Sequence, residues 1–199
     1  MRILTACLCA VGLLGAERTP VVVELFTSEG CSSCPPADLL LTRLSEKQSI
    51  VGVEIIALSE HVDYWNRLGW RDPFSSAELT ARQQRYAEVF GTDRVYTPQM
   101  VVDGRTEFVG SDAARADRVI ADAARQPKAA VRLSLAQGRL QIRVAPLPRR
   151  GVSADVLLAI TENSLESNVS RGENAGRRLR HIAVVRRLIQ LAHVCVLAS

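Results

Sequence analysis

The stretch that decides the fold of this chain reads Val21-Val22-Val23-Glu24-Leu25-Phe26-Thr27-Ser28-Glu29-Gly30-Cys31-Ser32-Ser33-Cys34-Pro35. A run of strand-forming residues is followed by a Cys-x-x-Cys pair and by a proline of the kind that opens helices. At the start of a helix, unpaired N–H groups and the helix dipole favour a thiolate over a thiol. Cys31 is therefore the candidate nucleophile, and Cys34 is the candidate resolving thiol.

Two other interpretations of this cysteine pair remain open. One is half of a zinc site, but His61, His181, His193 and Cys195 supply no second pair with ligand spacing. The other is an inert structural disulfide, since Cys-x-x-Cys closes a small ring. The strand-to-helix setting favours the reactive interpretation.

A second motif lies at residues 95–104, which read Val-Tyr-Thr-Pro-Gln-Met-Val-Val-Asp-Gly. Asp-Gly is a strong hairpin signal, and proline is the residue at which a cis peptide bond occurs. Pro98 on its own fits an ordinary trans proline that opens an edge strand. Together with the dithiol, the motif resembles the cis-proline loop of thioredoxin-like proteins. The resemblance implies that Thr97 and Pro98 lie against the dithiol and offer backbone groups to a substrate.

The composition sets broad limits on size and partners. The chain has 199 residues, a net charge of +4, 47% hydrophobic residues and 23% charged residues. These values suit one globular domain of ordinary size with a small second one. The sequence carries no nucleic-acid motif and no basic stripe interleaved with aromatic residues, so nucleic acid is not an expected partner.

Residues 1–16 have the pattern of a secretory signal peptide. A minimal basic start is followed by an apolar run over residues 3–14 and by the small residues Gly15 and Ala16. The run is shorter than the roughly 20 residues of a spanning helix, so we expect no stable membrane span after cleavage. Cleavage near Ala16 would leave Cys31, Cys34 and an unassigned Cys195, in a periplasmic or secreted protein.

Residues 17–126 are expected to form an α/β unit with a thioredoxin-like fold. The order of strand, helix and strand predicts a parallel pair with a right-handed crossover. Residues 60–91 depart from the minimal plan and are expected to form a helical insertion over the candidate site, with Ser75 or Ser76 as a helix cap. The elements expected are strands at 21–26 and 51–58, helices at 36–47, 76–90 and 112–125, and a hairpin of 99–102 with 106–109.

Residues 127–199 are expected to form a small antiparallel β domain. Apolar residues alternate at 131–135 and at 140–144 around Gln137-Gly138, which predicts a hairpin. Further strands are expected at 155–161 and 181–188, with a polar loop at 163–176.

The chain resembles a bacterial secreted-protein family catalogued as domain of unknown function 1223, within the thioredoxin-like superfamily. The resemblance extends over most of residues 21–187. It is carried by residues 24–38, 61–65, 68–74, Arg82-Gln83, 96–104 and the segment Gly172-Glu173-Asn174-Ala175-Gly176-Arg177 with His181 after it. It implies a fold and an exported setting, but no established reaction. The family usually continues further, so the C-terminal domain is expected to be short or truncated.

Two further residues are supporting candidates. Glu24 interrupts an apolar strand, and a buried acid behind the dithiol relays the resolving cysteine's proton in the superfamily that the chain resembles. His61 follows the second strand at the sheet edge that carries ligands in open parallel sheets. It is expected to stabilise the Cys31 thiolate, to join Cys31 and Cys34 in a copper or zinc site, or to bond within the insertion.

The sequence thus predicts an exported thiol–disulfide oxidoreductase that needs no cofactor and acts on protein or small-molecule thiols and disulfides. Two alternatives belong to other functional classes. One is a periplasmic copper- or zinc-handling protein that uses Cys31, Cys34 and His61. The other is a non-catalytic adaptor with structural cysteines.

Overall fold

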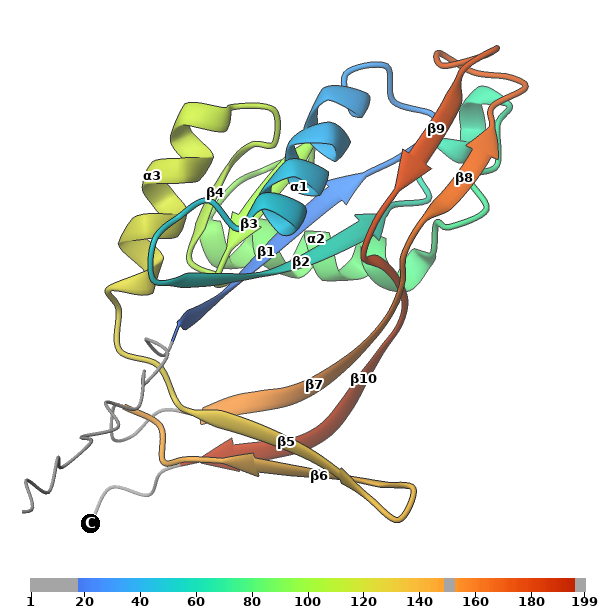
Figure 1. Ribbon diagram of the computed structural model, residues 1–199. Coiled ribbons are helices and arrows are strands. Elements are labelled where there is room, and N and C mark those ends of the chain that lie inside the picture. Colours follow the sequence, from blue (N-terminus) through green and yellow to red (C-terminus); the bar gives the residue numbers. More distant parts are fainter. Residues whose placement is uncertain (1–17, 149–152, 196–199) are drawn as a thin grey trace, which may run out of the picture.

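A six-stranded mixed sheet forms the centre of the computed structural model, which describes residues 18–148 and 153–195 (Figure 1). The expected signal peptide lies outside the described residues. The strand order is β4-β3-β1-β2-β10-β7. β1 and β2 are parallel, as predicted, while β3 and β4 continue the sheet as an antiparallel hairpin on the other side of β1.

The strands are β1 (Thr19–Thr27), β2 (Val53–His61), β3 (Gln99–Val102), β4 (Thr106–Val109), β5 (Val131–Ala136), β6 (Arg139–Val144), β7 (Ser153–Glu162), β8 (Leu165–Asn168), β9 (Arg178–His181) and β10 (Val184–Cys195). The helices are α1 (Pro35–Lys47), α2 (Ala77–Phe90) and α3 (Ala113–Ala124), with a 3-10 turn at Asn66–Leu68. The predicted hairpin β3–β4 has the expected bounds. The other elements of residues 19–124 agree within about three residues, as is usual for element ends.

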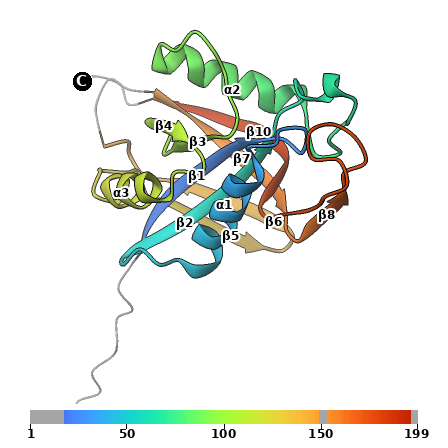
Figure 2. The same ribbon diagram turned by 90° about the horizontal axis from the view of Figure 1, so that it is seen from above.

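The helices cover the two faces of the sheet unequally. Figure 2 shows α2 on one face and α1 with α3 on the other. Side chains of a strand alternate between faces, so Val21, Val23 and Leu25 of β1 pack under α1 and α3 in the main core. Phe26 points to the opposite face, where it meets a smaller cluster with Tyr86 of α2.

Local sequence explains how α1 and α2 begin. Pro35 occupies the first turn of α1, where its missing N–H has no helical partner to lose. The Ser76 side chain caps α2 by accepting a hydrogen bond from the N–H of Leu79, as predicted. Leu39 is 69% exposed and Val89 is 72% exposed, because each lies on the outer side of its helix.

The C-terminal third of the chain joins the same sheet. β10 pairs in parallel with β2 where Val184 meets Ser59, and β7 pairs along β10. Register shifts in that ladder accompany its bend away from the sheet, towards the separate hairpin of β5 and β6 (Figure 1). The expected loop at 163–176 contains a strand, β8, which pairs with β9. The predicted domain boundary near residue 126 stays a prediction.

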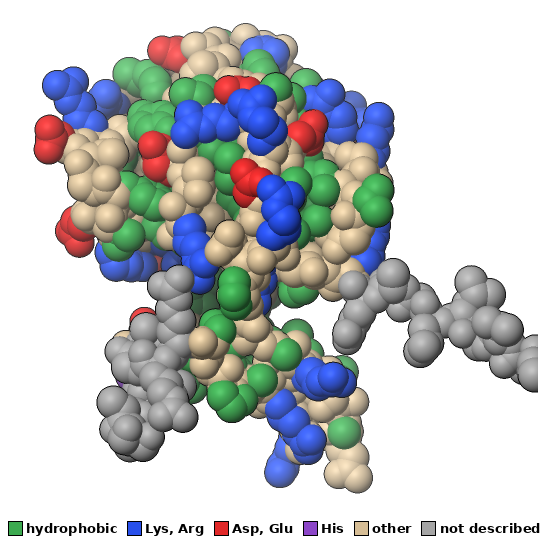
Figure 3. All heavy atoms as spheres, turned by 90° about the vertical axis from the view of Figure 1, so that its left-hand side faces the viewer, with side chains coloured by type: hydrophobic (Ala, Val, Ile, Leu, Met, Phe, Trp, Pro, Cys, Tyr) green, Lys and Arg blue, Asp and Glu red, His purple; other side chains and the backbone are tan. Residues whose placement is uncertain are grey.

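The surface differs between the two ends of the molecule. Figure 3 shows acidic and basic side chains interspersed on the α3 side of the upper part, and hydrophobic side chains among basic ones on the narrower lower part. Leu133 and Leu135 of β5 are 63% and 76% exposed there. Within the described ranges, no helix has both the length and the apolar character needed to cross a bilayer.

Candidate functional site

Cys31 and Cys34 form a disulfide at the junction of β1 and α1. Their Cα atoms are 5.4 Å apart, within the usual range for a disulfide. The hydroxyl of Ser33 lies 3.3 Å from Sγ of Cys31, where it can donate a hydrogen bond to a thiolate formed on reduction. Neither cysteine has exposed surface. In this conformation Cys31 is therefore inaccessible to a partner.

The loop of residues 169–177 covers the disulfide. Nδ2 of the buried Asn174 donates to the carbonyl oxygens of Glu29 and Cys31, at 2.8 and 2.9 Å. The carboxylate of Glu173 accepts a hydrogen bond from the N–H of Ser32 at 2.9 Å. This bond lowers the pKa of Glu173. Three hydrogen bonds thus hold a late segment of the chain onto the Cys-x-x-Cys turn.

The first turn of α1 has fewer free N–H groups than the sequence argument assumed. Pro35 and Pro36 have none, and the N–H groups of Ala37 and Asp38 both donate to the carbonyl of Cys34. Stabilisation of a Cys31 thiolate therefore falls to the helix dipole and to the Ser33 hydroxyl. The expectation of unpaired helical donors at this position is corrected accordingly.

Thr97 and Pro98 lie at the same end of the sheet, and their peptide bond is cis, as predicted. Nε1 of Trp65 donates to the hydroxyl of Thr97 at 2.8 Å. A Cβ at Gly30 would lie 3.0 Å from Cβ of Trp65, so the tryptophan lies directly against the residue before Cys31. Trp65 thus connects the 97–98 turn to the disulfide loop and belongs to the site.

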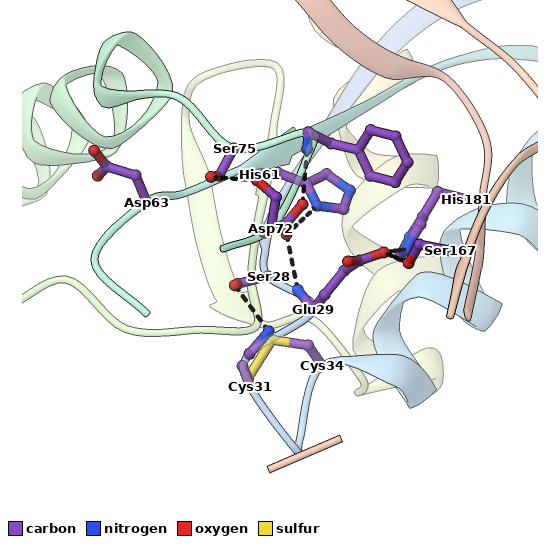
Figure 4. A network of polar contacts seen from close by, with 12 residues as sticks. Ser28, Glu29, Cys31, Cys34, His61, Asp63, Asp72, Ser75, Ser167 and His181 are labelled. Carbon is purple, nitrogen blue, oxygen red and sulfur yellow. Dashed lines mark hydrogen bonds and ion pairs between the residues drawn. A yellow bond between two sulfur atoms is a disulfide. The ribbon is translucent and has the colours of Figure 1, made fainter. Parts of the chain in front are cut away.

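A buried polar cluster lies beside the disulfide, with Glu29 at its centre (Figure 4). The Glu29 carboxylate accepts hydrogen bonds from Nε1 of Trp70 at 2.8 Å and from the Ser167 hydroxyl, and it contacts Nε2 of His181 at 3.1 Å. Its own N–H donates to Asp72. Glu29 therefore joins β1 to the C-terminal strands β8 and β9.

His61 belongs to this cluster through Asp72. Nδ1 of His61 is 2.7 Å from Oδ2 of Asp72, and both side chains are buried. Burial favours the neutral form of His61, but the Asp72 carboxylate outweighs that effect and raises the pKa of His61 above its ordinary value. Burial likewise opposes ionisation of Asp72, yet His61 and backbone donors lower the pKa of this carboxyl. The two side chains thus form a buried contact that joins the end of β2 to the segment before α2.

Asp38 of α1 is a further buried carboxylate near the disulfide. It follows Cys34 by one turn of α1, its N–H donating to the Cys34 carbonyl at 3.1 Å. Burial raises the pKa of Asp38, although the nearby His181 and His61 partly offset the effect. Oδ1 of Asp38, Nδ1 of His181 and Nε2 of His61 are buried and have no hydrogen-bond partner among the described residues.

Glu24 is not placed with the disulfide. It lies on the α2 face of the sheet, where Arg82 donates to its carboxylate at 2.7 Å and the Tyr86 hydroxyl at 2.5 Å. Alternation along β1 sends Glu24 away from the face that α1 covers. The proton-relay role expected for Glu24 therefore lacks its geometry.

The alternative metal site is not assembled either. Cys31 and Cys34 are bonded to each other, and His61 bonds to Asp72. Across residues 18–148 and 153–195, no group of three or more His, Cys, Asp or Glu side chains is arranged to hold a metal ion. The backbone of Cys195 ends β10, and the chemistry expected of it stays unassigned.

The structure adds residues that the sequence argument did not assign. Glu29, Asp38 and Asp72 are buried acids, and Asn174 contacts the disulfide loop from 143 positions away. Glu29 and Asp38 had a local signal, since each flanks the cysteine pair within four residues. Asn174 lies in a segment that carries the family resemblance, but its contact had no local signal, because its partners are distant backbone carbonyls.

Comparisons with known proteins identify a family. A family model described as protein of unknown function DUF1223 matches residues 22–196, so the chain belongs to that family. The chain is also similar to a crystal structure of a protein from Agrobacterium tumefaciens. The identity is 30%, the TM-score is 0.75, and the match covers 89% of this chain and 74% of that one. No curated protein matches significantly.

Proposed function

We propose that this protein is an exported thiol–disulfide oxidoreductase of the thioredoxin-like superfamily, and that its disulfide is exposed only when the 169–177 loop lifts. The observation that carries the proposal is the Cys31–Cys34 disulfide at the junction of β1 and α1, with the Ser33 hydroxyl beside Cys31. A disulfide also suits an oxidising compartment.

The proposed reaction transfers two electrons between the dithiol and a partner disulfide. The Cys31 thiolate attacks one sulfur of the partner, which forms a mixed disulfide and releases the other partner sulfur as a thiolate. The Cys34 thiolate then attacks Sγ of Cys31, which restores the Cys31–Cys34 bond and releases the second partner thiolate. The cysteine pair is oxidised and the partner is reduced. The reverse sequence oxidises a partner dithiol.

The loop contacts decide how a partner reaches Cys31. Both sulfurs belong to fully buried residues, so the exchange needs a conformation in which Asn174 and Glu173 have left the Cys-x-x-Cys turn. Three hydrogen bonds are a modest barrier, because each contributes only about 0.5–1.5 kcal/mol net. Local openings of this size are populated in native proteins.

The burial of the disulfide favours a second candidate, a non-catalytic protein in which Cys31–Cys34 is a structural bond. Catalysis of insulin reduction and of oxidative refolding separates the two. The oxidoreductase accelerates at least one of these reactions, and a Cys31→Ser variant does not. Cys195→Ser is the matched control, because it removes a cysteine and leaves the pair intact.

Trapping provides the second test. A Cys34→Ser variant leaves Cys31 without its resolving thiol, so a mixed disulfide with a partner should accumulate and be identified by mass spectrometry. If wild-type protein catalyses neither reaction and Cys34→Ser traps no partner, the disulfide is structural and the proposal is wrong.

A further inference from the structure

Glu29 is a buried carboxylate that takes no part in the proposed exchange, although it lies two positions before Cys31. A buried charge is costly unless hydrogen bonds satisfy it. Figure 4 shows the Glu29 carboxylate pointing towards Ser167 and His181 rather than towards the disulfide. The partners that offset the cost of this charge therefore come largely from the C-terminal part of the chain.

These partners belong to the segment that covers the disulfide. We call residues 165–181 the cover, which consists of β8, the 169–177 loop and β9. Glu29 bonds to each of its three parts. Ser167 of β8 and His181 of β9 contact the Glu29 carboxylate, and Asn174 of the loop donates to the Glu29 carbonyl oxygen at 2.8 Å. One residue after β1 thus holds the cover at three separate places.

The cover is a hairpin with its own internal bonds. β8 and β9 form a separate two-stranded sheet. Two hydrogen bonds close the base of the loop, from the N–H of Val169 to the carbonyl of Arg177 at 2.9 Å and from the N–H of Gly176 to the carbonyl of Val169 at 2.8 Å. The tip of the loop carries the two side chains that bond to the Cys-x-x-Cys turn. A contact that fixes the strands therefore also places the tip.

We propose that Glu29 is a positioning residue that holds the cover on the Cys31–Cys34 disulfide and thereby sets how often the disulfide becomes accessible. Its side chain bonds to the cover and to Trp70, and its N–H bonds to Asp72. It acts through the cover and not on the sulfur atoms. That this control serves catalysis rests on the proposed function, whereas the control of access itself does not.

A carboxylate suits this position because both of its oxygens accept hydrogen bonds. Oε2 accepts from Nε1 of Trp70 at 2.8 Å, and an indole has only a donor to offer. Oε1 accepts from the Ser167 hydroxyl and lies 3.1 Å from Nε2 of His181. A neutral amide of the same shape has one oxygen and one NH2 group. In either orientation the NH2 group replaces an acceptor, so at least one of these bonds is lost.

The test is the rate at which dithiothreitol reduces the disulfide of the oxidised full-length protein. Glu29→Gln should speed reduction about tenfold, because it weakens hydrogen bonds to a charged group. Ser167→Ala removes one of the same bonds from the side of the cover and should speed reduction by about threefold or more. Glu46→Gln makes the same chemical change at an exposed position of α1 and should leave the rate unchanged.

A second background distinguishes control of the cover from a direct effect on the sulfurs. The double variant Glu173→Ala/Asn174→Ala removes the three bonds between the tip of the loop and the Cys-x-x-Cys turn and its flank. Adding Glu29→Gln to it should change the reduction rate less than about twofold, since residues that act through one contact are not additive. A direct electrostatic effect of Glu29 on Cys31 would persist in full.

Two further measurements show where each variant acts. The N–H of Ser32 donates to Glu173, so hydrogen exchange at this amide, followed by NMR, reports whether the cover is in place. It should quicken in Glu29→Gln and in Ser167→Ala. Exchange of the β1 amides reports the rest of the fold and should stay as in wild type. The buried side chains of Val169 and Leu179 keep the cover packed when single hydrogen bonds are lost.

The outcomes separate this proposal from the proposed function, because dithiothreitol needs no natural partner. Unchanged reduction in Glu29→Gln and Ser167→Ala overturns the proposal, and so does an acceleration that persists in the second background or that accompanies faster exchange of β1. The expected rates in a protein that catalyses neither insulin reduction nor refolding keep the role of Glu29 and reject the oxidoreductase. Catalysis without any effect of Glu29→Gln on reduction rejects only the role of Glu29.

Discussion

At the scale of single residues, Asn174 connects the disulfide to the rest of the chain. Its amide satisfies two carbonyl groups of the Cys-x-x-Cys turn, and it has no exposed surface. Within the Cys-x-x-Cys turn Asn174 bonds only to backbone atoms, which leaves the cysteine side chains free to react. Asn174 is thus suited to control access without taking part in the chemistry.

Replacing Asn174 by Ala should speed reduction of the disulfide by dithiothreitol about tenfold. The change removes two hydrogen bonds to buried carbonyl groups. This lowers the free energy of loop opening by roughly 1–2 kcal/mol, so the open loop is more populated. Stopped-flow or quenched thiol labelling gives the rate. Asn168→Ala, on the exposed side of β8, is the control. A rate equal to that of wild type would show that the loop does not limit access.

Glu60 is the residue whose charge should set the pH dependence of stability. Burial, and then the neighbouring Glu24 carboxylate, raise the pKa of Glu60 well above its ordinary value of 4.5. The folded state therefore holds this proton more tightly than the unfolded state. Ionisation of Glu60 costs stability as the pH rises from the ordinary value through the raised one.

A Glu60→Gln variant should be more stable than wild type near pH 8 by more than about 1 kcal/mol, and the gain should vanish below about pH 4. Urea denaturation across this range measures the difference. Glu54→Gln, exposed on the same strand, should show neither effect. A gain that persists in acid would mean that Gln improves packing rather than removing a charge.

At the scale of elements, the site depends on a close approach of three segments at Gly110. A Cβ at this position would lie 2.7 Å from Cδ1 of Leu25, 3.3 Å from Cβ of Ala37 and 3.3 Å from Cβ of Pro98. β1, α1 and the 97–98 turn therefore meet around the bare backbone of one glycine. Its N–H also donates to the carbonyl of Pro98 at 2.9 Å.

Gly110→Ala should destabilise the fold by about 1–3 kcal/mol, because the added methyl group overpacks this junction. The midpoint of urea denaturation gives the change, with Ser111→Ala, one position along and exposed, as the control. Unchanged stability would mean that Leu25 moves aside without cost.

The sequence predicted the local elements of this fold well and its long-range contacts poorly. Ser76, Asp112 and the Asp103-Gly104 turn act through neighbours a few residues away, so their roles follow from local chemistry. The function expected of Glu24 depended on which face its side chain occupies. That face is set by the packing of α1 and α2 on the sheet, which residue spacing alone did not resolve.

In the candidate site, too, the local motifs were predicted and the long-range contacts were not. Cys31, Cys34 and the 97–98 turn were found from motifs that carry their chemistry in adjacent residues. The cover over the disulfide was not found, because residues 163–176 look like a polar loop when their partners are unknown. Asn174 donates to the carbonyl of Cys31, and Glu173 accepts from the N–H of Ser32. Bonds to backbone atoms so far away in the chain leave no trace in residue spacing.

At the scale of the whole molecule, the central sheet and the β5–β6 hairpin differ in how firmly they are held. β1 is flanked by β2 and β3 and covered by helices on both faces. β5 pairs only with β6 in the described part of the chain, and all six of its residues are exposed. Local stability follows burial and pairing, so it should fall from the central sheet towards this hairpin.

Hydrogen exchange followed by mass spectrometry should record that gradient. Amides of β1 around Val21–Leu25 should exchange last, near the limit set by global unfolding, and those of β5 and β6 should exchange first. Protection of β5 comparable to that of β1 would contradict the gradient and would indicate that the apolar strand is covered in solution.

The distance along the chain between the disulfide and its cover has a consequence for biosynthesis. Asn174 follows Cys31 by 143 positions, so a growing chain presents both thiols long before the segment that shields them has been made. Chains fold progressively from the N-terminus during synthesis, which leaves an interval when an oxidant meets the cysteines unshielded. Once the late segment docks, any further exchange of that bond has to wait until the loop lifts. Oxidation of the nascent chain, rather than the redox environment of the folded protein, would then set the initial redox state of each new molecule.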